Sequence, residues 1–391
     1  MYKRLVEDKI KKYIGNNKIL LLLWARQVGK TTIIKKIKKE LEKKGESCDY
    51  INLENPEFLS ILNQHPDNLF KIIWNSDKNK YVFIDEIQYL KNPSNFLKYI
   101  YDEYKWKIKL IVTWSSAFYI DKKFTDSLSW RKKIFYIKSL NFEEFLIFKQ
   151  KEKYIEVLKE KVIPLIHKNN IFNLYYEFIT FWGYPEVVLE NDLEEKKELL
   201  EEIWLSYIKK DILEAWVEYE EKYFYILKIL ASQIGSLLNI KEISNTVNLN
   251  VATVEKYIYI MKKSFHIATI SPFYKNIRKE IIKMPKIYFY DLGLRNYFIN
   301  NFDNFDFRID KWELFENLIF RNLLNNYKLT DIKFWRTQNK NEIDFILEKD
   351  KKAIEVKINK DKFHIIKYKL FLENYPEFNL EVEYLENSIY L

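Results

Sequence analysis

Apolar runs of strand length alternate with helical patterns along the first 140 residues. KILLLL (18–23) is a continuous apolar run after its lysine, and TTIIKKIKKELEKK (31–44) alternates Ile or Leu with Lys at helical spacing. Three further apolar runs follow, YVFIDEIQYL (81–90), KLIVTWSSAF (109–118) and IFYIKSL (134–140). This alternation predicts an α/β domain with a parallel sheet.

From residue 141 to about residue 230, a continuous helical pattern replaces the alternation of strands and helices. The tract begins with NFEEFLIFKQKEKYIEVLKEKV (141–162), where Asn141 is the expected N-cap. Only 6 glycines and 8 prolines punctuate the whole chain, so boundaries must be found from changes in pattern. The sequence shows no long linker, low-complexity segment or solenoid repeat.

Residues 223–273 have the pattern of a winged helix. A helix (223–235), a short helix (240–247), a tight turn and a third helix (251–265) precede the strand-like HIATISPF. In a DNA-binding winged helix the third helix enters the major groove. The side chains expected to face the duplex are Thr253, Lys256, Lys262 and Lys263. A winged helix that serves only protein packing is the alternative.

Length and composition limit the class of protein. The 391 residues are enough for two or three domains, and no apolar run approaches the roughly 18 residues of a membrane span. The start lacks a signal-peptide core, so a cytoplasmic protein is expected. The single Cys48 excludes internal disulfides and a thiolate zinc cluster, while the net charge of +9 permits nucleic-acid contact without showing it.

The segment WARQVGKTT (24–32) resembles a phosphate-binding loop between a strand and a helix. Such loops follow G-x-x-x-x-G-K-[ST] and cradle phosphates with backbone N–H groups. Gly29, Lys30 and Thr31 fill the closing positions, and Trp24 occupies the place of the first glycine. The residues expected to contact nucleotide are Trp24, Ala25, Arg26, Gln27, Val28, Gly29, Lys30, Thr31 and Thr32.

Two later strands end in polar residues that suit the same chemistry. In YVFIDEIQYL (81–90) the predicted strand ends in the acidic pair Asp85 and Glu86. This pair predicts one carboxylate near Mg²⁺ and one beside the attacking water. Thr113, Ser115 and Ser116 follow the next apolar run and are able to sense the γ-phosphate, with a purely structural strand end as the alternative. The two motifs in this order predict nucleotide hydrolysis far more specifically than either alone.

The C-terminal region carries a third set of charged residues. Glu316 lies in a predicted helix, Asp344 in one predicted strand, and Glu355 with Lys357 on one face of the next strand. This is the pattern of a PD-(D/E)xK nuclease centre, in which carboxylates hold Mg²⁺ and the lysine stabilises developing charge. A polar hairpin face with a Glu/Lys pair is the alternative.

Taken in order, these motifs resemble a known family over nearly the whole chain. The segments that carry the resemblance are ARQVGKTT, FIDEIQYL, TWSSAF, WGYPEVV (182–188), YIKKDI (207–212), KIYFYDLGLRN (286–296), LFENLIF (314–320), WRTQNKNEIDFIL (335–347) and IEVK (354–357). They look like the bacterial and archaeal AAA-type ATPases whose C-terminal region contains a winged helix and a restriction-endonuclease-like domain of unknown function.

The resemblance implies a domain order and roles for residues. It implies a P-loop AAA-type domain (1–145), a helical lid or linker (146–219), a winged helix (220–275) and a restriction-endonuclease-like α+β domain (276–391). It implies ATP and Mg²⁺ as cofactors, with Lys30 on phosphate and Thr31 and Asp85 at the metal. It assigns Glu86 to catalysis and Ser115 to sensing. Arg131 is the expected finger for a neighbouring nucleotide site, which implies a homo-oligomer; DNA is a further implied partner.

Five tryptophans stand where the family pattern has glycine. They are Trp24, Trp114, Trp130, Trp182 and Trp312, in a chain with 10 Trp and only 6 Gly. Translation of UGA as tryptophan in a gene that reads UGA as glycine would produce this pattern. A degenerate paralogue and genuine tryptophans are the alternatives, and UGG codons at these positions would remove the hypothesis. An indole at position 24 is expected to hinder the loop from wrapping around phosphate and to weaken ATP binding.

Overall fold

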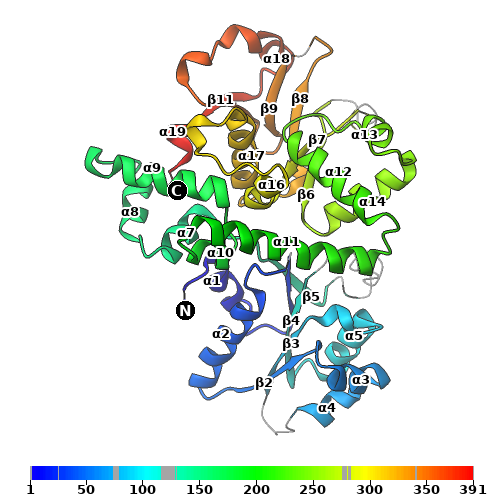
Figure 1. Cartoon of the computed structure of the whole chain (residues 1–391). Helices are drawn as coiled ribbons and strands as arrows, with labels where there is room; N and C mark the ends of the chain where they lie inside the picture. Colours follow the sequence, from blue (N-terminus) through cyan, green and yellow to red (C-terminus); the bar gives the residue numbers. More distant parts are fainter. Residues whose placement is uncertain are drawn as a thin grey trace. The chain divides into compact units, whose positions relative to one another are not determined.

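The chain folds into two compact units. The computed structural model describes residues 2–24, 26–73, 79–115, 128, 130–274, 280, 283–339 and 341–390. The first unit takes in residues 1–139 and 263–265, and the second takes in residues 140–262 and 266–391. In Figure 1 the first unit runs from blue to cyan and most of the second from green to red.

A five-stranded parallel sheet forms the centre of the first unit. Its order is β2-β3-β4-β1-β5, and every neighbouring pair runs parallel. The strands are β1 (Ile19–Leu23), β2 (Ser47–Asn52), β3 (Lys80–Asp85), β4 (Ile108–Trp114) and β5 (Lys132–Tyr136). All five residues of β1 are buried, as expected for a central strand covered on both faces. The predicted α/β fold with a parallel sheet is therefore confirmed.

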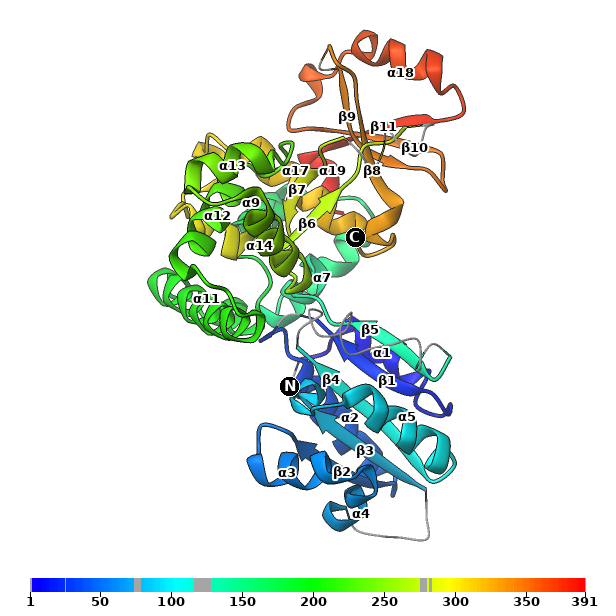
Figure 2. The ribbon, with the colours of Figure 1, turned by 90° about the vertical axis from the view of Figure 1, so that its right-hand side faces the viewer.

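Amphipathic helices pack beside this sheet, as Figure 2 shows for α2 and α5. The helix α2 buries Ile33, Ile34 and Ile37 against the strands while most of its lysines remain outside, which accounts for the alternation seen in the sequence. The helices of the unit are α1 (Leu5–Lys11), α2 (Lys30–Lys43), α3 (Pro56–Gln64), α4 (Leu69–Ile72) and α5 (Pro93–Tyr104), with 3-10 turns η1 (Pro66–Asn68) and η2 (Ile87–Tyr89).

The second unit begins with the predicted helical tract. Asn141 caps its first helix: the Asn141 side chain accepts a hydrogen bond from Glu144 N, and the Glu144 side chain accepts one from Asn141 N. The helices are α7 (Phe142–Phe148), α8 (Lys153–Lys159), α9 (Leu165–Phe181), α10 (Pro185–Leu189) and α11 (Leu193–Ala215). No helix in the described part of the chain combines the length and the apolarity needed to cross a bilayer.

Three helices and a strand follow in the order that the sequence predicts, and a further strand pairs with that strand. They are α12 (Glu220–Ser232), α13 (Ile240–Val247), α14 (Val251–Lys263), β6 (Ile267–Ile270) and β7 (Lys286–Phe289), with β6 and β7 antiparallel. The domain boundary expected after residue 275 falls between these two paired strands. The hairpin therefore joins the three-helix segment to residues that the sequence assigns to the next domain.

A four-stranded mixed sheet completes the second unit, in the order β11-β10-β9-β8. The remaining elements are α16 (Leu292–Phe298), η4 (Phe305–Phe307), α17 (Lys311–Leu323), η5 (Leu329–Asp331), β8 (Ile332–Arg336), β9 (Glu342–Leu347), β10 (Lys352–Lys357), η6 (Lys360–Lys362), η7 (Ile365–Tyr368), α18 (Lys369–Asn374), β11 (Asn379–Tyr384) and α19 (Leu385–Ser388). Strands β9 and β10 pair antiparallel with Phe345 opposite Ile354. Continuing that register sets Asp344 against Glu355, as the predicted hairpin requires.

Of the five tryptophans at family glycine positions, Trp182 has the most unusual backbone. Its φ of 59° and ψ of −150° lie in a region that is essentially restricted to glycine. The side chain is nevertheless buried and stacks on Phe178 with ring centroids 4.6 Å apart. Trp114 is also fully buried. Glycine at either position would leave a cavity, which lowers the free energy of unfolding. At Trp182 this loss opposes the gain from relieving the backbone strain.

Trp216 gives a cleaner test of a tryptophan in a glycine conformation. It ends α11 with φ 51° and ψ 54°, and its side chain is 85% exposed. Trp216→Gly is expected to raise the free energy of unfolding by about 1 kcal/mol, because the left-handed strain disappears and no core contact is lost. Urea melts measure the change. Two variants serve as controls. Trp216→Ala keeps a Cβ in the left-handed conformation, and Trp106→Gly changes an exposed tryptophan without positive φ. Equal gains in the free energy of unfolding in all three variants would contradict the explanation.

Candidate nucleotide site

The segment between β1 and α2 forms the predicted loop. Gln27 and Gly29 have left-handed φ values of 55° and 91°, and Gly29 is the N-cap of α2. The first backbone N–H groups of α2 therefore lie at this end of the helix, where an anion is favoured. Ala25 lies outside the described residues.

The position of Trp24 differs from what the sequence suggests. Trp24 has no left-handed φ, so glycine-like strain falls on Gln27 instead. Its indole is buried, stacks on Phe265 at 4.2 Å between ring centroids and meets Tyr136 edge to face at 6.0 Å. Any effect of Trp24 on phosphate binding must therefore come from its bulk and its packing.

The ammonium of Lys30 lies against the start of the loop. Only 5% of Lys30 is exposed, and Nζ donates a hydrogen bond to the Trp24 carbonyl oxygen at 3.0 Å. Burial, helped by Arg26, lowers the pKa of Lys30 to about 8, although Glu86 and Asp85 act in the opposite direction. A buried cation at the start of the loop is well placed to exchange its contact with the Trp24 carbonyl for one with a phosphate oxygen.

Asp85, the last residue of β3, is hydrogen-bonded from three elements. One carboxylate oxygen accepts from Thr31 Oγ1 at 2.7 Å and from Tyr50 OH at 2.8 Å. The other accepts from Thr113 Oγ1. Thr31 and Asp85, 54 residues apart in sequence, thus lie within one hydrogen bond of each other. Hydroxyl and carboxylate oxygens are ligands that suit Mg²⁺, so these two residues fit the predicted metal role.

Glu86 follows Asp85 in a left-handed conformation, with φ 56° and ψ 50°. Its carboxylate accepts hydrogen bonds from Ser115 Oγ at 2.6 Å and from Gln88 Nε2. Burial favours the protonated acid, but Lys30, the Ser115 hydroxyl and Arg26 outweigh it and lower the pKa of Glu86. Glu86 is therefore ionised at neutral pH and able to accept a proton.

The structure brings Lys30, Thr31, Asp85, Glu86 and Ser115 together at the carboxyl ends of parallel strands. Sequence reasoning missed Tyr50 and Gln88, which hold the two carboxylates. Tyr50 lies on β2 in register with Phe83 of β3, so only the order of the strands could have revealed it. Ser116 lies outside the described residues.

Arg131 lies at the amino ends of the strands of this sheet, opposite the ends that lead into the nucleotide site. Its carbonyl oxygen accepts from Ile19 N at the start of β1, whereas the loop follows the end of β1. Its guanidinium forms two hydrogen bonds with Asp102 on α5, at 2.7 and 3.0 Å, and lies 4.1 Å from the ring centre of Trp130. Arg131 therefore does not face the nucleotide site of its own chain.

The predicted carboxylates of the second unit also come together. Glu316 on α17, Asp344 on β9 and Glu355 on β10 are all buried, and Glu355 forms an ion pair with Lys357. Burial raises the pKa of Glu316 and of Glu355, while Lys286 acts in the opposite direction on Glu316 and Lys357 does so on Glu355. Among the described residues, no three or more His, Cys, Asp or Glu side chains are arranged to hold a metal ion. The nuclease centre predicted from spacing is thus assembled without a metal-binding geometry.

The four predicted DNA-contacting residues lie along or at the end of α14. Lys256 and Lys262 are exposed, while Thr253 and Lys263 are half-buried. Lys256 Nζ donates to the Trp216 carbonyl oxygen at 3.4 Å.

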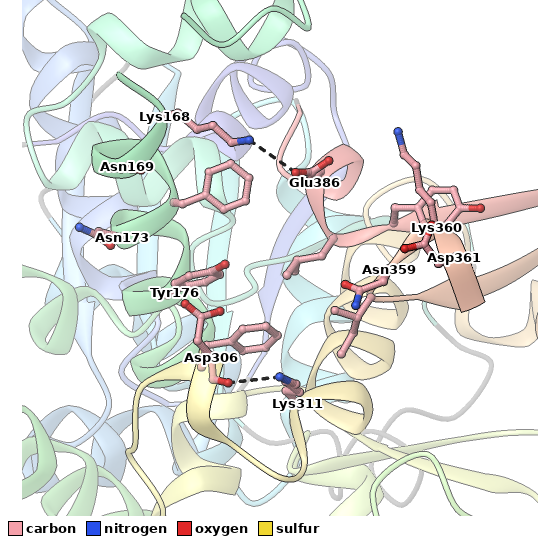
Figure 3. Close-up of a pocket in the computed structure, with 15 residues that line it drawn as sticks. Lys168, Asn169, Asn173, Tyr176, Asp306, Lys311, Asn359, Lys360, Asp361 and Glu386 are labelled. Atoms are coloured by element: carbon pink, nitrogen blue, oxygen red, sulfur yellow. Dashed lines mark hydrogen bonds and ion pairs between the residues drawn. The ribbon is translucent and has the colours of Figure 1, made fainter. Parts of the chain in front are cut away.

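A pocket of about 830 Å³ opens in the second unit beside α9. Figure 3 shows two contacts of its lysines: Lys168 pairs with the Glu386 carboxylate at 3.5 Å, and Lys311 donates to the backbone carbonyl oxygen of Asp306 at 3.2 Å. Stacked rings of Tyr176 and Phe305 add an apolar part. The pocket has a balanced charge and contains no residue of the phosphate loop.

Two archaeal proteins and several solved structures are similar to this chain. The uncharacterized protein MJ1544 of Methanocaldococcus jannaschii is 27% identical over 86% of this chain and 74% of its own length. The uncharacterized protein MJ1637 of the same organism is 25% identical over 74% of this chain and 65% of its own length. The chain thus spans about two thirds of MJ1637.

The similarity to solved structures is weaker. AMPPCP-bound DnaA from Aquifex aeolicus shares 15% identity over 65% of this chain and 86% of that chain, with a TM-score of 0.34. The DNA clamp loader delta protein of Bacillus subtilis shares 14% identity over 81% and 99%, with a TM-score of 0.30. TM-scores this low support no conclusion about function.

Three family models match successive parts of the chain. Residues 173–304 and 313–384 match two domains of unknown function, DUF8612 and DUF4143. Residues 16–146 match the model of an AAA domain. The parallel sheet, the loop that leads into α2 and this match together support a P-loop AAA-type ATPase domain at residues 16–146.

Proposed function

We propose that the chain binds ATP at the loop before α2 and hydrolyses it with Glu86 as the general base. The observation that carries this proposal is the convergence of Lys30, Thr31, Asp85 and Glu86 at one edge of the parallel sheet. Ligands of open α/β sheets bind at the carboxyl ends of the strands. The AAA match over residues 16–146 supports the same assignment.

Binding would use groups that the loop already orients. The first N–H groups of α2 meet phosphate oxygens, and the Lys30 ammonium moves from the Trp24 carbonyl to the β- and γ-phosphates. Thr31 and Asp85 are the residues that would hold Mg²⁺. That ion supplies charge neutralisation at the phosphates when it is bound.

Hydrolysis would depend on the ionised carboxylate of Glu86. The lowered pKa keeps Glu86 deprotonated, so it can accept a proton from the attacking water. The Ser115 hydroxyl and the Gln88 amide hold the carboxylate in place. With ATP bound, Ser115 is positioned to exchange its bond to Glu86 for one to the γ-phosphate.

Phosphate release from ATP with Mg²⁺, measured with and without DNA, tests this function. Saturable release supports an ATPase. ATP binding without release, together with DNA affinity that depends on nucleotide, would favour a second function, that of a nucleotide-switched DNA-binding protein. Arg131 remains a proposal for the site of a neighbouring subunit, because it lies far from the site of its own chain.

The DNA-binding alternative rests on the exposed lysines of α14. Lys256→Glu is expected to weaken DNA binding and to reduce the salt dependence of the affinity, because a phosphate contact and its released counterion are lost. Lys228→Glu on α12 is the matched control, since it makes the same charge change at another exposed helix position. Fluorescence anisotropy at several salt concentrations measures both. Equal salt slopes in the two variants and the parent would mean that α14 has a packing role.

A further inference from the structure

The buried carboxylates of the second unit surround a lysine that the nuclease pattern does not include. Lys286 Nζ lies 2.9 Å from Glu316 Oε1, 2.5 Å from Glu342 Oε1 and 3.5 Å from Asp344 Oδ1. The Lys286 residue has no exposed surface. Three carboxylates from two elements therefore share one internal ammonium.

The charges in this cluster are close to balanced. Burial disfavours the Lys286 ammonium, but Glu316, Asp344 and Glu342 outweigh that effect and raise the pKa of Lys286. Arg336 forms an ion pair with Glu342, and Lys357 forms one with Glu355. The cation that a nuclease centre would take from solution is thus supplied by the chain.

Backbone and side-chain contacts fix the position of this ammonium. Lys286 begins β7, pairs with Ile270 of β6 and forms a bridge with Leu237. Tyr288, two residues further along β7, donates to the same Glu316 oxygen at 2.6 Å. Gly235 faces Glu316 so closely that an added Cβ would lie 3.1 Å from Oε2. The ammonium is therefore held by the packed hairpin and is not a mobile surface group.

Lys286 would have to leave before these carboxylates could coordinate a divalent ion. Such an ion sits about 2 Å from its oxygen ligands, so it would lie close to the ammonium that contacts the same oxygens. The second carboxylate oxygen of Asp344 also has a partner within the chain, because it accepts a hydrogen bond from Val356 N at 2.9 Å. The donor chemistry suits a metal, but the arrangement of charges does not.

We infer that Lys286 takes the place of the metal ion in the carboxylate centre, and that the resulting ion cluster fastens the β6–β7 hairpin to α17 and the C-terminal sheet. The cluster is a structural element of the second unit rather than a metal-dependent nuclease site. This inference does not depend on ATP binding in the first unit.

Binding of Mn²⁺ without nucleotide tests the inference in the full-length chain. The unaltered protein and Asp344→Asn are expected to leave the same amount of free Mn²⁺, measured by electron paramagnetic resonance, and neither should melt at a higher temperature with the metal. Binding by the unaltered protein that Asp344→Asn abolishes would overturn the inference.

Removal of the ammonium gives the second readout. Lys286→Met keeps the length of the side chain but leaves the carboxylates without their cation, so a lower melting temperature and at least about tenfold tighter Mn²⁺ binding are expected. The double variant with Asp344→Asn should lose that binding. Lys286→Arg retains a cation and serves as the matched control. A Lys286→Met protein that melts like the parent would overturn the inference; if it fails to fold, the titration of the unaltered protein still tests whether metal is excluded.

Discussion

Glu86→Gln is expected to lower ATP turnover by roughly 10²–10⁴-fold, because the amide cannot accept a proton from the attacking water. The substitution preserves the shape of the side chain and can keep its contacts with Ser115 and Gln88. ATP binding should therefore persist, with the affinity changed little. Steady-state phosphate release measures turnover, and equilibrium binding of a fluorescent ATP analogue measures affinity.

Glu103→Gln is the matched control for this experiment. Glu103 is exposed on α5, so the same chemical change there should leave turnover intact. If both variants hydrolyse ATP as fast as the parent, Glu86 is not the base. If Glu86→Gln loses binding together with turnover, the carboxylate has a structural role in the loop and not a catalytic one.

Lys30→Ala is expected to weaken ATP binding by about a hundredfold or more, since charge-assisted hydrogen bonds to phosphate contribute about 1.5–3 kcal/mol each. The fold should survive, because the hydrogen bond from Lys30 Nζ to the Trp24 carbonyl oxygen holds the loop and not the sheet. Lys39→Ala, an exposed position on the same helix, is the matched control. Equal affinities in the two variants would refute the assignment of the phosphate loop.

The pKa of Lys30 adds a pH dependence to this prediction. Without nucleotide the ammonium has a pKa of about 8, and bound phosphate favours its charged form. The affinity for ATP should therefore be highest below pH 8 and fall as the pH rises through 8. Lys30→Ala should lack this dependence. A parent protein whose affinity is constant between pH 7 and 9 would contradict the proposed contact.

The sequence predicted the candidate site wherever chemistry followed the ends of strands. The apolar runs before Trp24, Asp85 and Ser115 became neighbouring parallel strands, so their polar ends had to meet at one edge. The start of α7 was predictable from a local signal. The side-chain oxygen of Asn141 accepts a hydrogen bond from a backbone N–H group at the N-terminus of the helix. The β9–β10 hairpin followed from two alternating strands a short turn apart.

Contacts that depend on tertiary packing were not predictable. Nothing near Lys286 in the sequence indicates three carboxylates, because Glu316, Glu342 and Asp344 arrive from other elements. The placement of Arg131 beside the start of β1, away from the loop of its own chain, also depends on how the strands pair. The left-handed residues of the loop are Gln27 and Gly29 and not Trp24, since local patterns do not fix the dihedral angles of an irregular loop.

The most direct measurement of the central claim is the structure of the full-length protein with Mg²⁺ and a non-hydrolysable ATP analogue. The account predicts phosphate oxygens at the N-terminus of α2, with Lys30 Nζ moved from the Trp24 carbonyl to the β- and γ-phosphates, and Glu86 facing the γ-phosphate. An analogue bound elsewhere, or Lys30 still on Trp24 with the nucleotide present, would contradict it.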